Sequence, residues 1–305
     1  MNTTSNLQRV LNEGKFAVTA ECGPPKSADP EVILSKGAIL KGCVDAVNVT
    51  DNQTAIVRMC SLAACALLTS IGLEPVLQMV ARDRNRIALQ SDILGASALG
   101  IRNMLCLSGD HQKFGNMKEG KNVYDLDSIQ LIQTADNMCE KGVFLGEDEP
   151  MPAPPKMFIG AAANPFADPF EFRALRLAKK VAAGAKFVQT QCIFDMAKFK
   201  KWMKIVRDMG LTEKVYILGG VTPLKGPGMA KYMKNNVAGM DVPDELIKRM
   251  EGTPKEKWRE EGIKIAAETI RKLKAIDGVA GVHIMAIEWE EAVPLIMEQA
   301  GIKRK

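Results

Sequence analysis

Short β-favouring runs alternate with longer segments of helical spacing along the whole of this 305-residue sequence. The runs are rich in Val, Ile, Phe and Thr and end in turn-forming residues, which is typical of strands. Strands are predicted at residues 16–21, 44–49, 75–80, 103–107, 157–162, 187–191, 215–218 and 279–286. Helices are predicted at residues 29–42, from after 53 to 71, 85–99, 125–140, 168–183, 195–209, in two or three stretches between 228 and 275, and at 290–300.

Eight strand–helix units whose strands are apolar on both faces are typical of a closed parallel barrel. We therefore predict an α/β fold, a single (β/α)8 TIM barrel with an eight-stranded parallel sheet, as one domain over residues 1–305. A doubly wound open sheet is the alternative. It is less favoured because no strand in the sequence is followed by a G-x-G-x-x-G fingerprint.

Composition narrows the class of protein. With 47% hydrophobic and 25% charged residues, the sequence matches an ordinary globular protein, and it has no apolar run of the roughly 18 residues that a membrane span needs. The first residues lack the pattern of a secretory signal, so a cytoplasmic location is expected. The net charge of +5 is dispersed, which argues against nucleic acid as a partner. Seven cysteines without a C-x-x-C pair predict neither a disulfide framework nor an intrinsic metal site.

Polar side chains stand where the predicted strands end, and these ends meet on the face that carries active sites in barrels. They are Glu21, Thr50, Gln78, Asp110 and Gln191. A helix cap is an equally good interpretation for Thr50. Glu21 and Gln191 have no obvious helix start beside them. A carboxyl such as Glu21, held at the end of a buried strand, can have a raised pKa and serve as a general acid.

The stretch 103–111 shows this pattern most clearly, since an apolar strand ends abruptly in Ser108, Gly109 and Asp110. Taken alone, these residues are explained by a turn and a helix cap. The polar insert at 109–122 that follows is typical of a loop covering a ligand. Only two histidines exist: His283, expected in the core, and His111, which could touch a ligand. A metal cage or a histidine-based triad therefore has little support, and a borrowed redox cofactor fits better.

Five segments in order resemble one family, the 5,10-methylenetetrahydrofolate reductases, which are flavin-containing barrels. They are residues 19–25 (TAECGPP), 47–50 (VNVT), 107–110 (LSGD), 180–185 (KVAAGA) and 190–195 (TQCIFD). The variant at 49–53 and the stretch 82–91 look like the short bacterial form of anaerobes that make acetyl units from one-carbon compounds. The resemblance covers nearly the whole chain and implies reduction of methylenetetrahydrofolate to 5-methyltetrahydrofolate.

The resemblance also implies roles for individual residues. Glu21 would protonate folate N10 and open the five-membered ring to an iminium ion. Asp110 would hold the pterin and favour that cation, Gln191 would bind the pterin edge, and Thr50 would contact the substrate. Hydride would pass from the reduced flavin N5 to the exocyclic carbon. The flavin contacts implied are Thr50, Gln78, Ser108, Gly109, Asp110, Tyr124, Ala162, Lys179 and Lys180.

Departures from the family pattern bear on the cofactor and the electron donor. Ser108 replaces an arginine, and Arg173 and Arg176 replace acidic and amide flavin contacts, whereas Lys179 and Lys180 remain as cationic partners for a phosphate. The resemblance implies FAD, and these changes affect the contacts to its adenine half, so FMN is the alternative. The familiar arginine near Glu288 and Trp289 is absent, which weakens the carry-over of nicotinamide contacts. The branch resembled implies a small zinc-binding partner subunit and an iron–sulfur electron donor. Direct oxidation of NADH, a flavin-free pterin-binding methyl carrier or methyltransferase, and a non-catalytic scaffold are the alternatives.

Overall fold

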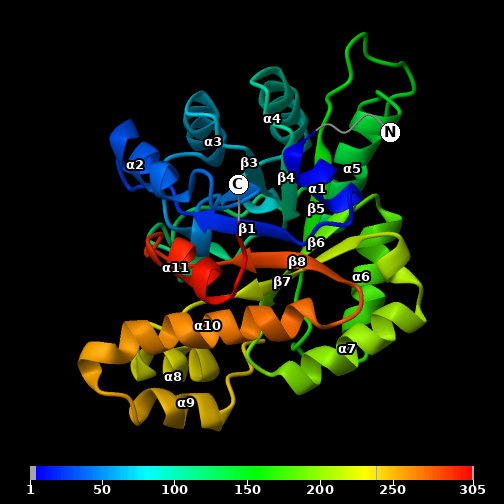
Figure 1. The fold of residues 1–305 in the computed structure, drawn as a ribbon. Helices are drawn as coiled ribbons and strands as arrows, with labels where there is room; N and C mark the ends of the chain where they lie inside the picture. Colours follow the sequence, from blue (N-terminus) through cyan, green and yellow to red (C-terminus); the bar gives the residue numbers. More distant parts are fainter. Residues whose placement is uncertain (1–4, 238, 304–305) are drawn as a thin grey trace.

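The computed structural model describes residues 5–237 and 239–303, and in them eight parallel strands close into a barrel in the order β1 to β8 (Figure 1). The predicted fold class is therefore confirmed. The strands are β1 (Ala17–Cys22), β2 (Ala46–Val49), β3 (Pro75–Val80), β4 (Asn103–Leu107), β5 (Phe158–Ala163), β6 (Phe187–Cys192), β7 (Tyr216–Val221) and β8 (Val279–Ile284).

Helices follow the strands and surround the barrel, and α8, α9 and α10 lie together along one side of it (Figure 1). The α-helices are α1 (Asn6–Asn12), α2 (Pro30–Leu40), α3 (Ser61–Ser70), α4 (Arg86–Ala98), α5 (Ser128–Glu140), α6 (Phe172–Ala182), α7 (Met196–Asp208), α8 (Pro227–Asn236), α9 (Asp244–Glu251), α10 (Trp258–Lys274) and α11 (Ala292–Gln299). Short 3-10 turns are η1 (Gln53–Ala55), η2 (Ala81–Asp83), η3 (Gln112–Phe114), η4 (Leu211–Glu213) and η5 (Lys255–Lys257). None of the helices in the described ranges is long and apolar enough to cross a membrane.

Two features differ from the sequence prediction. The prediction of a helix from after residue 53 to 71 is wrong in its first part, because α3 begins only at Ser61. Positive φ angles at Asn52, Thr54 and Ala55 turn the chain away from a helical path, and the Asn52 side chain then accepts a hydrogen bond from the Arg58 backbone N–H at 3.0 Å. The second difference is α1, which the sequence analysis missed.

Helix α1 closes the N-terminal end of the barrel. Its apolar residues Leu7, Val10 and Leu11 are buried against the lower interior layer, which includes Phe187 and Leu218. The Glu74 carboxylate accepts hydrogen bonds from the first backbone N–H groups of α1, at 2.6 Å and 2.8 Å. The lower interior of the barrel is thus apolar and covered by α1, and active sites of barrels lie at the opposite end.

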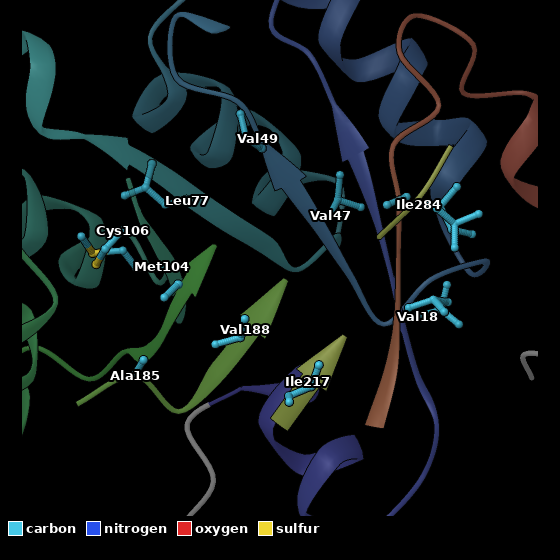
Figure 2. Packing of buried hydrophobic residues seen from close by; sticks show 14 of the residues in the cluster. Val18, Val47, Val49, Leu77, Met104, Cys106, Ala185, Val188, Ile217 and Ile284 are labelled. Atoms are coloured by element: carbon cyan, nitrogen blue, oxygen red, sulfur yellow. The ribbon is translucent and has the colours of Figure 1, made fainter. Parts of the chain in front are cut away.

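Successive side chains of each strand point alternately out of the barrel and into it, so the sheet has an outer and an inner packing surface. Outward-facing residues such as Val18, Val47, Val188 and Ile284 belong to one large apolar cluster with the surrounding helices (Figure 2). Inward-facing residues change from apolar at the lower end to polar above it. This polarity gradient places hydrogen-bonding groups at the C-terminal ends of the strands.

Candidate active site

A cavity of about 350 Å³ opens at the C-terminal ends of the strands, and we call it the main cavity. Most of the side chains predicted for the site line it together. These are Glu21, Thr50, Gln78, Ser108, Gly109, Asp110, Ala162, Lys180 and Gln191. Tyr124 and Lys179 do not line it. The expected convergence of strand ends therefore brings carboxyl, amide, hydroxyl and ammonium groups around one space.

Glu21 lies near the end of β1, and its side chain is only 11% exposed. Burial raises the pKa of this carboxyl to about 7, since the charged form loses its hydration. A hydrogen bond from Gln78 acts in the opposite direction, and the charge of Glu290 adds to the rise in pKa. Glu21 is therefore a carboxyl that holds a proton close to neutral pH, which is what a general acid requires.

Thr50 carries the clearest sign of a ligand-binding role. It directly follows β2, is 1% exposed, and its Oγ1 is buried without a hydrogen-bond partner. A buried hydroxyl without a partner is costly, and an incoming ligand would satisfy it. Gln191 of β6 also lines the main cavity and is half-buried. Its amide offers both a donor and an acceptor to a ligand.

The turn after β4 is held in place from the neighbouring loops. Gly109 has φ +88° and lies so close to β3 that an added Cβ would stand 3.1 Å from the Cβ atoms of Val80 and Arg82. The Arg82 guanidinium donates to the backbone oxygen of Asp110 at 3.1 Å and to that of Asn52 at 3.3 Å. The Asp110 side chain is exposed and free to meet a ligand at the mouth.

Tyr124 and His111 support this region from outside the cavity. The Tyr124 hydroxyl donates to the Gly109 carbonyl at 3.2 Å, so the ring braces the turn. The His111 Nδ1 accepts a hydrogen bond from the Lys113 backbone N–H at 3.2 Å, which caps η3. The insert at 109–122 therefore packs beside η1 at the rim, where a ligand-covering loop was predicted.

A basic corner lies where β5 and α6 meet. The Lys180 ammonium is buried and donates to the Ala162 carbonyl at 2.6 Å. Burial and the nearby Arg176 charge lower the pKa of Lys180 to about 8. A side hollow of about 160 Å³ adjoins this corner and is lined by Arg173, Arg176 and Lys180. Among the described residues, none of these three cations forms a salt bridge, so the corner can accept an anion.

Lys179 has a different setting from its neighbour. It is exposed and lies over the Phe172 ring, with its Nζ 5.8 Å from the ring centroid. Lys179 and Lys180 were predicted together as phosphate contacts, but their side chains leave α6 in different directions, as those of adjacent helical residues do. Only Lys180 points to the basic corner.

Arg82 is the main residue of the cavity lining that was not predicted from the sequence. Its side chain is 3% exposed, lines the main cavity and forms a salt bridge to Asp83 at 2.6 Å. The sequence signal was a run of charges directly after an apolar strand, Arg82 to Arg84.

Within the described ranges, no group of three or more His, Cys, Asp or Glu could hold a metal ion. All seven cysteines are free thiols.

The fold and the cavity define a (β/α)8-barrel protein with a polar ligand site built around a buried carboxyl. A model of the family described as methylenetetrahydrofolate reductase matches residues 6–301. The chain therefore belongs to the methylenetetrahydrofolate reductase family, which confirms the resemblance seen in the sequence.

Two curated relatives show the extent of the match. The chain is similar to the probable methylenetetrahydrofolate reductase (NADPH) of Caenorhabditis elegans, with 23% identity over 311 residues that cover 97% of this chain and 44% of the relative. It is also similar to methylenetetrahydrofolate reductase 1 of Schizosaccharomyces pombe, with 27% identity over 217 residues, 68% of this chain and 32% of the relative. The chain thus spans less than half the length of these relatives.

A solved structure supports the fold. An uncharacterized protein from Clostridium thermocellum, described as binding two copies of 5-methyl-5,6,7,8-tetrahydrofolic acid, matches with a TM-score of 0.65 and 11% identity. The match covers 97% of this chain and 99% of that one. At this identity, the likeness concerns the barrel alone.

Proposed function

We propose that this protein reduces 5,10-methylenetetrahydrofolate to 5-methyltetrahydrofolate in one-carbon metabolism with the help of a bound flavin. The observation that carries the proposal is Glu21, a buried carboxyl whose pKa is raised to about 7 in the same cavity as Asp110 and Gln191. Ring opening of the folate needs an acid that still holds its proton near neutral pH. The family match agrees with this reaction.

The residues around the main cavity suit a flavin. The unpartnered Thr50 hydroxyl, the close-packed turn at Ser108 and Gly109, and the buried Lys180 ammonium supply a hydroxyl, a backbone edge and a cation. We propose that Lys180 holds the flavin phosphate and that the other groups contact the flavin rings, together with Gln78 and Ala162. FAD is our first expectation. FMN is the alternative, because Arg173 and Arg176 make the phosphate end strongly basic.

A bound reduced flavin would supply the hydride. The chain's own residues would prepare the substrate to receive it. Glu21 holds a proton while buried and delivers it to folate N10, and Gln78 orients the Glu21 carboxyl through their hydrogen bond. Asp110 stands at the mouth, where a carboxylate favours the cationic iminium form. Gln191 and Thr50 would bind the substrate through their amide and hydroxyl groups.

We further propose that electrons come from a partner, namely a small zinc-binding subunit together with an iron–sulfur protein. Large apolar side chains are exposed on the loops beside the cavity, which is typical of a surface that meets another protein. They are Val57 (54%), Phe114 (62%), Met117 (57%), Val123 (44%) and Tyr124 (39%). The C. elegans relative is named as an NADPH enzyme, so direct nicotinamide oxidation is the competing proposal.

The test begins with protein purified from a native source without oxygen. We expect a yellow protein that, once reduced, converts methylenetetrahydrofolate to 5-methyltetrahydrofolate, and co-eluting subunits that are identified by mass spectrometry. Stopped-flow mixing of the isolated flavin-loaded protein with NADH or NADPH then tests the donor. Bleaching fast enough to support turnover, without any added subunit, would contradict the partner proposal and leave the reductase proposal intact.

A flavin-free methyl carrier or methyltransferase is the second candidate. It is favoured by the solved barrel from C. thermocellum, whose description names bound 5-methyltetrahydrofolate. Protein that binds 5-methyltetrahydrofolate tightly but remains colourless, and takes up neither FAD nor FMN, would favour this candidate over the reductase.

A further inference from the structure

A buried polar layer crosses the barrel interior directly below Glu21. The Gln189 amide nitrogen donates to the Asn48 oxygen at 2.9 Å and to the Thr19 hydroxyl oxygen at 3.0 Å, while Asn48 donates back to Gln189 at 2.6 Å. The Thr19 Oγ1 lies 3.0 Å from His283 Nδ1. All four residues are at most 3% exposed, so the layer is shielded from bulk water.

The other nitrogen of the His283 ring faces the candidate acid. His283 Nε2 lies 4.0 Å from the Glu21 Oε2. The two residues come from neighbouring strands, since Thr19 of β1 is paired in register with His283 of β8.

The hydrogen-bond pattern favours one position for the hydrogen of the His283 ring. Both hydrogens of the Gln189 amide are used, so Thr19 is an acceptor toward Gln189 and its own hydroxyl hydrogen must point elsewhere. The candidates are His283 Nδ1 at 3.0 Å and the Val282 carbonyl at 3.4 Å. The shorter contact favours Thr19 as the donor to Nδ1. A neutral ring then carries its hydrogen on Nε2, directed at Glu21.

His283 stays neutral because burial lowers its pKa to about 3. A neutral N–H donor is well suited to a carboxyl that alternates between two protonation states. It does not hold Glu21 permanently ionised, as a cation would. It strengthens its contact only when the carboxylate forms, since hydrogen bonds to charged groups are stronger than those to neutral ones.

We propose that His283 is a positioning residue for Glu21, whose Nε2–H, fixed by the Thr19–Gln189–Asn48 chain, binds the Glu21 carboxylate once its proton has left. This inference rests on the proposed function of Glu21 as the acid. Closing the 4.0 Å gap to hydrogen-bond distance needs a shift of about 1 Å, within reach of a carboxyl rotation. No proton leaves His283 in this step; the proton goes from Glu21 to the substrate nitrogen.

Other groups around Glu21 do not take over this role. Glu290 is paired with Lys36 at 3.2 Å, and its negative charge opposes ionisation of Glu21. The thiols of Cys22 and Cys192 have pKa values raised to about 12, so they remain neutral near pH 7. Gln78 approaches the carboxyl from β3 and is not titratable. Of the described groups that influence Glu21, His283 is the donor on the β8 side.

The first test reads the tautomer directly. Protein labelled with 15N-histidine gives signals from only His111 and His283, and His111→Leu assigns them. We expect long-range 1H–15N spectra to show His283 as the neutral Nε2–H form from about pH 5 to 8. A ring protonated on Nδ1 alone, or on both nitrogens, would overturn the proposal. This measurement uses the wild-type protein and needs no substrate.

The second test follows the Glu21 carboxyl in 13C-labelled protein, with Glu21→Gln to assign its signal. His283→Leu should raise the pKa of Glu21 by about one unit or more, because the carboxylate loses a charge-assisted hydrogen bond. His111→Leu is the matched control and should leave this pKa unchanged. An unchanged pKa in folded His283→Leu protein overturns the positioning role. If Glu21→Gln instead retains turnover, the proposed function fails and the tautomer result still stands by itself.

Discussion

The two adjacent lysines of α6 give the sharpest prediction about cofactor binding. Lys180 is 8% exposed and points to the basic corner, whereas Lys179 is exposed beside Phe172. Loss of a charge-assisted contact to phosphate at a buried position costs about 2 kcal/mol or more, which weakens flavin binding about 30-fold. Lys180→Met should therefore show this loss. Lys179→Met, one residue away, should bind flavin nearly as wild type does.

The assay is a titration of the flavin-free protein with FAD and with FMN, in which the quenching of flavin fluorescence reports binding. Because the pKa of Lys180 is lowered to about 8, the ammonium is charged below that pH, and flavin affinity should fall as the pH rises through it. In Lys180→Met this pH dependence should disappear. Equal affinity in wild type and Lys180→Met, with a loss in Lys179→Met instead, would refute the assignment of the phosphate to the buried corner.

Three further predictions concern stability and local structure. Gly109→Ala should cost about 1–3 kcal/mol in urea unfolding, because its φ of +88° and the 3.1 Å approach to Val80 exclude a methyl group without strain; a cost below 0.5 kcal/mol, on the order of a neutral surface change, would contradict this. The folded pKa of Glu21 lies above its unfolded value of 4.5, so its neutral form favours folding at low pH and this stability is lost as the pH rises through about 7. Relative to wild type, Glu21→Gln should therefore gain about 3 kcal/mol of unfolding free energy between pH 4 and 8. Parallel curves of unfolding free energy against pH for the two proteins would contradict this. Leu7→Ala should destabilise the barrel by about 2–5 kcal/mol, and a change near zero in thermal or urea unfolding would mean that α1 is not a structural plug.

The fold followed from the sequence because parallel strands buried on both faces leave strong local signals. Each predicted strand overlaps an observed one, and β3 and β4 match to the residue. Helix α1 was missed because it is only seven residues long, so the helical spacing of Leu7, Val10 and Leu11 covers less than two turns, and contact with the barrel interior stabilises it. The start of α3 was misjudged because the left-handed residues 52, 54 and 55 depend on tertiary contacts to Arg58 and the neighbouring loops.

The site was partly predictable for a similar reason. Strand ends identified Glu21, Thr50, Asp110 and Gln191, since the topology of a barrel brings all such ends together. Sequence could not reveal that His283 turns into the barrel toward Glu21, because its contacts come from residues far away in the chain. The raised pKa of Glu21 was predicted from its place at the end of a buried strand, but its size depends on burial by residues that only the assembled structure brings together.

The central claim is that Glu21 delivers the proton that opens the folate ring. Its most direct test is a single-turnover measurement, in which protein with chemically reduced flavin is mixed with methylenetetrahydrofolate without oxygen, and flavin reoxidation and 5-methyltetrahydrofolate are followed together. We predict that Glu21→Gln binds flavin and accepts electrons as wild type does, but forms product about 10²–10⁴-fold more slowly. Product formation by Glu21→Gln at a near wild-type rate would remove Glu21 from the mechanism.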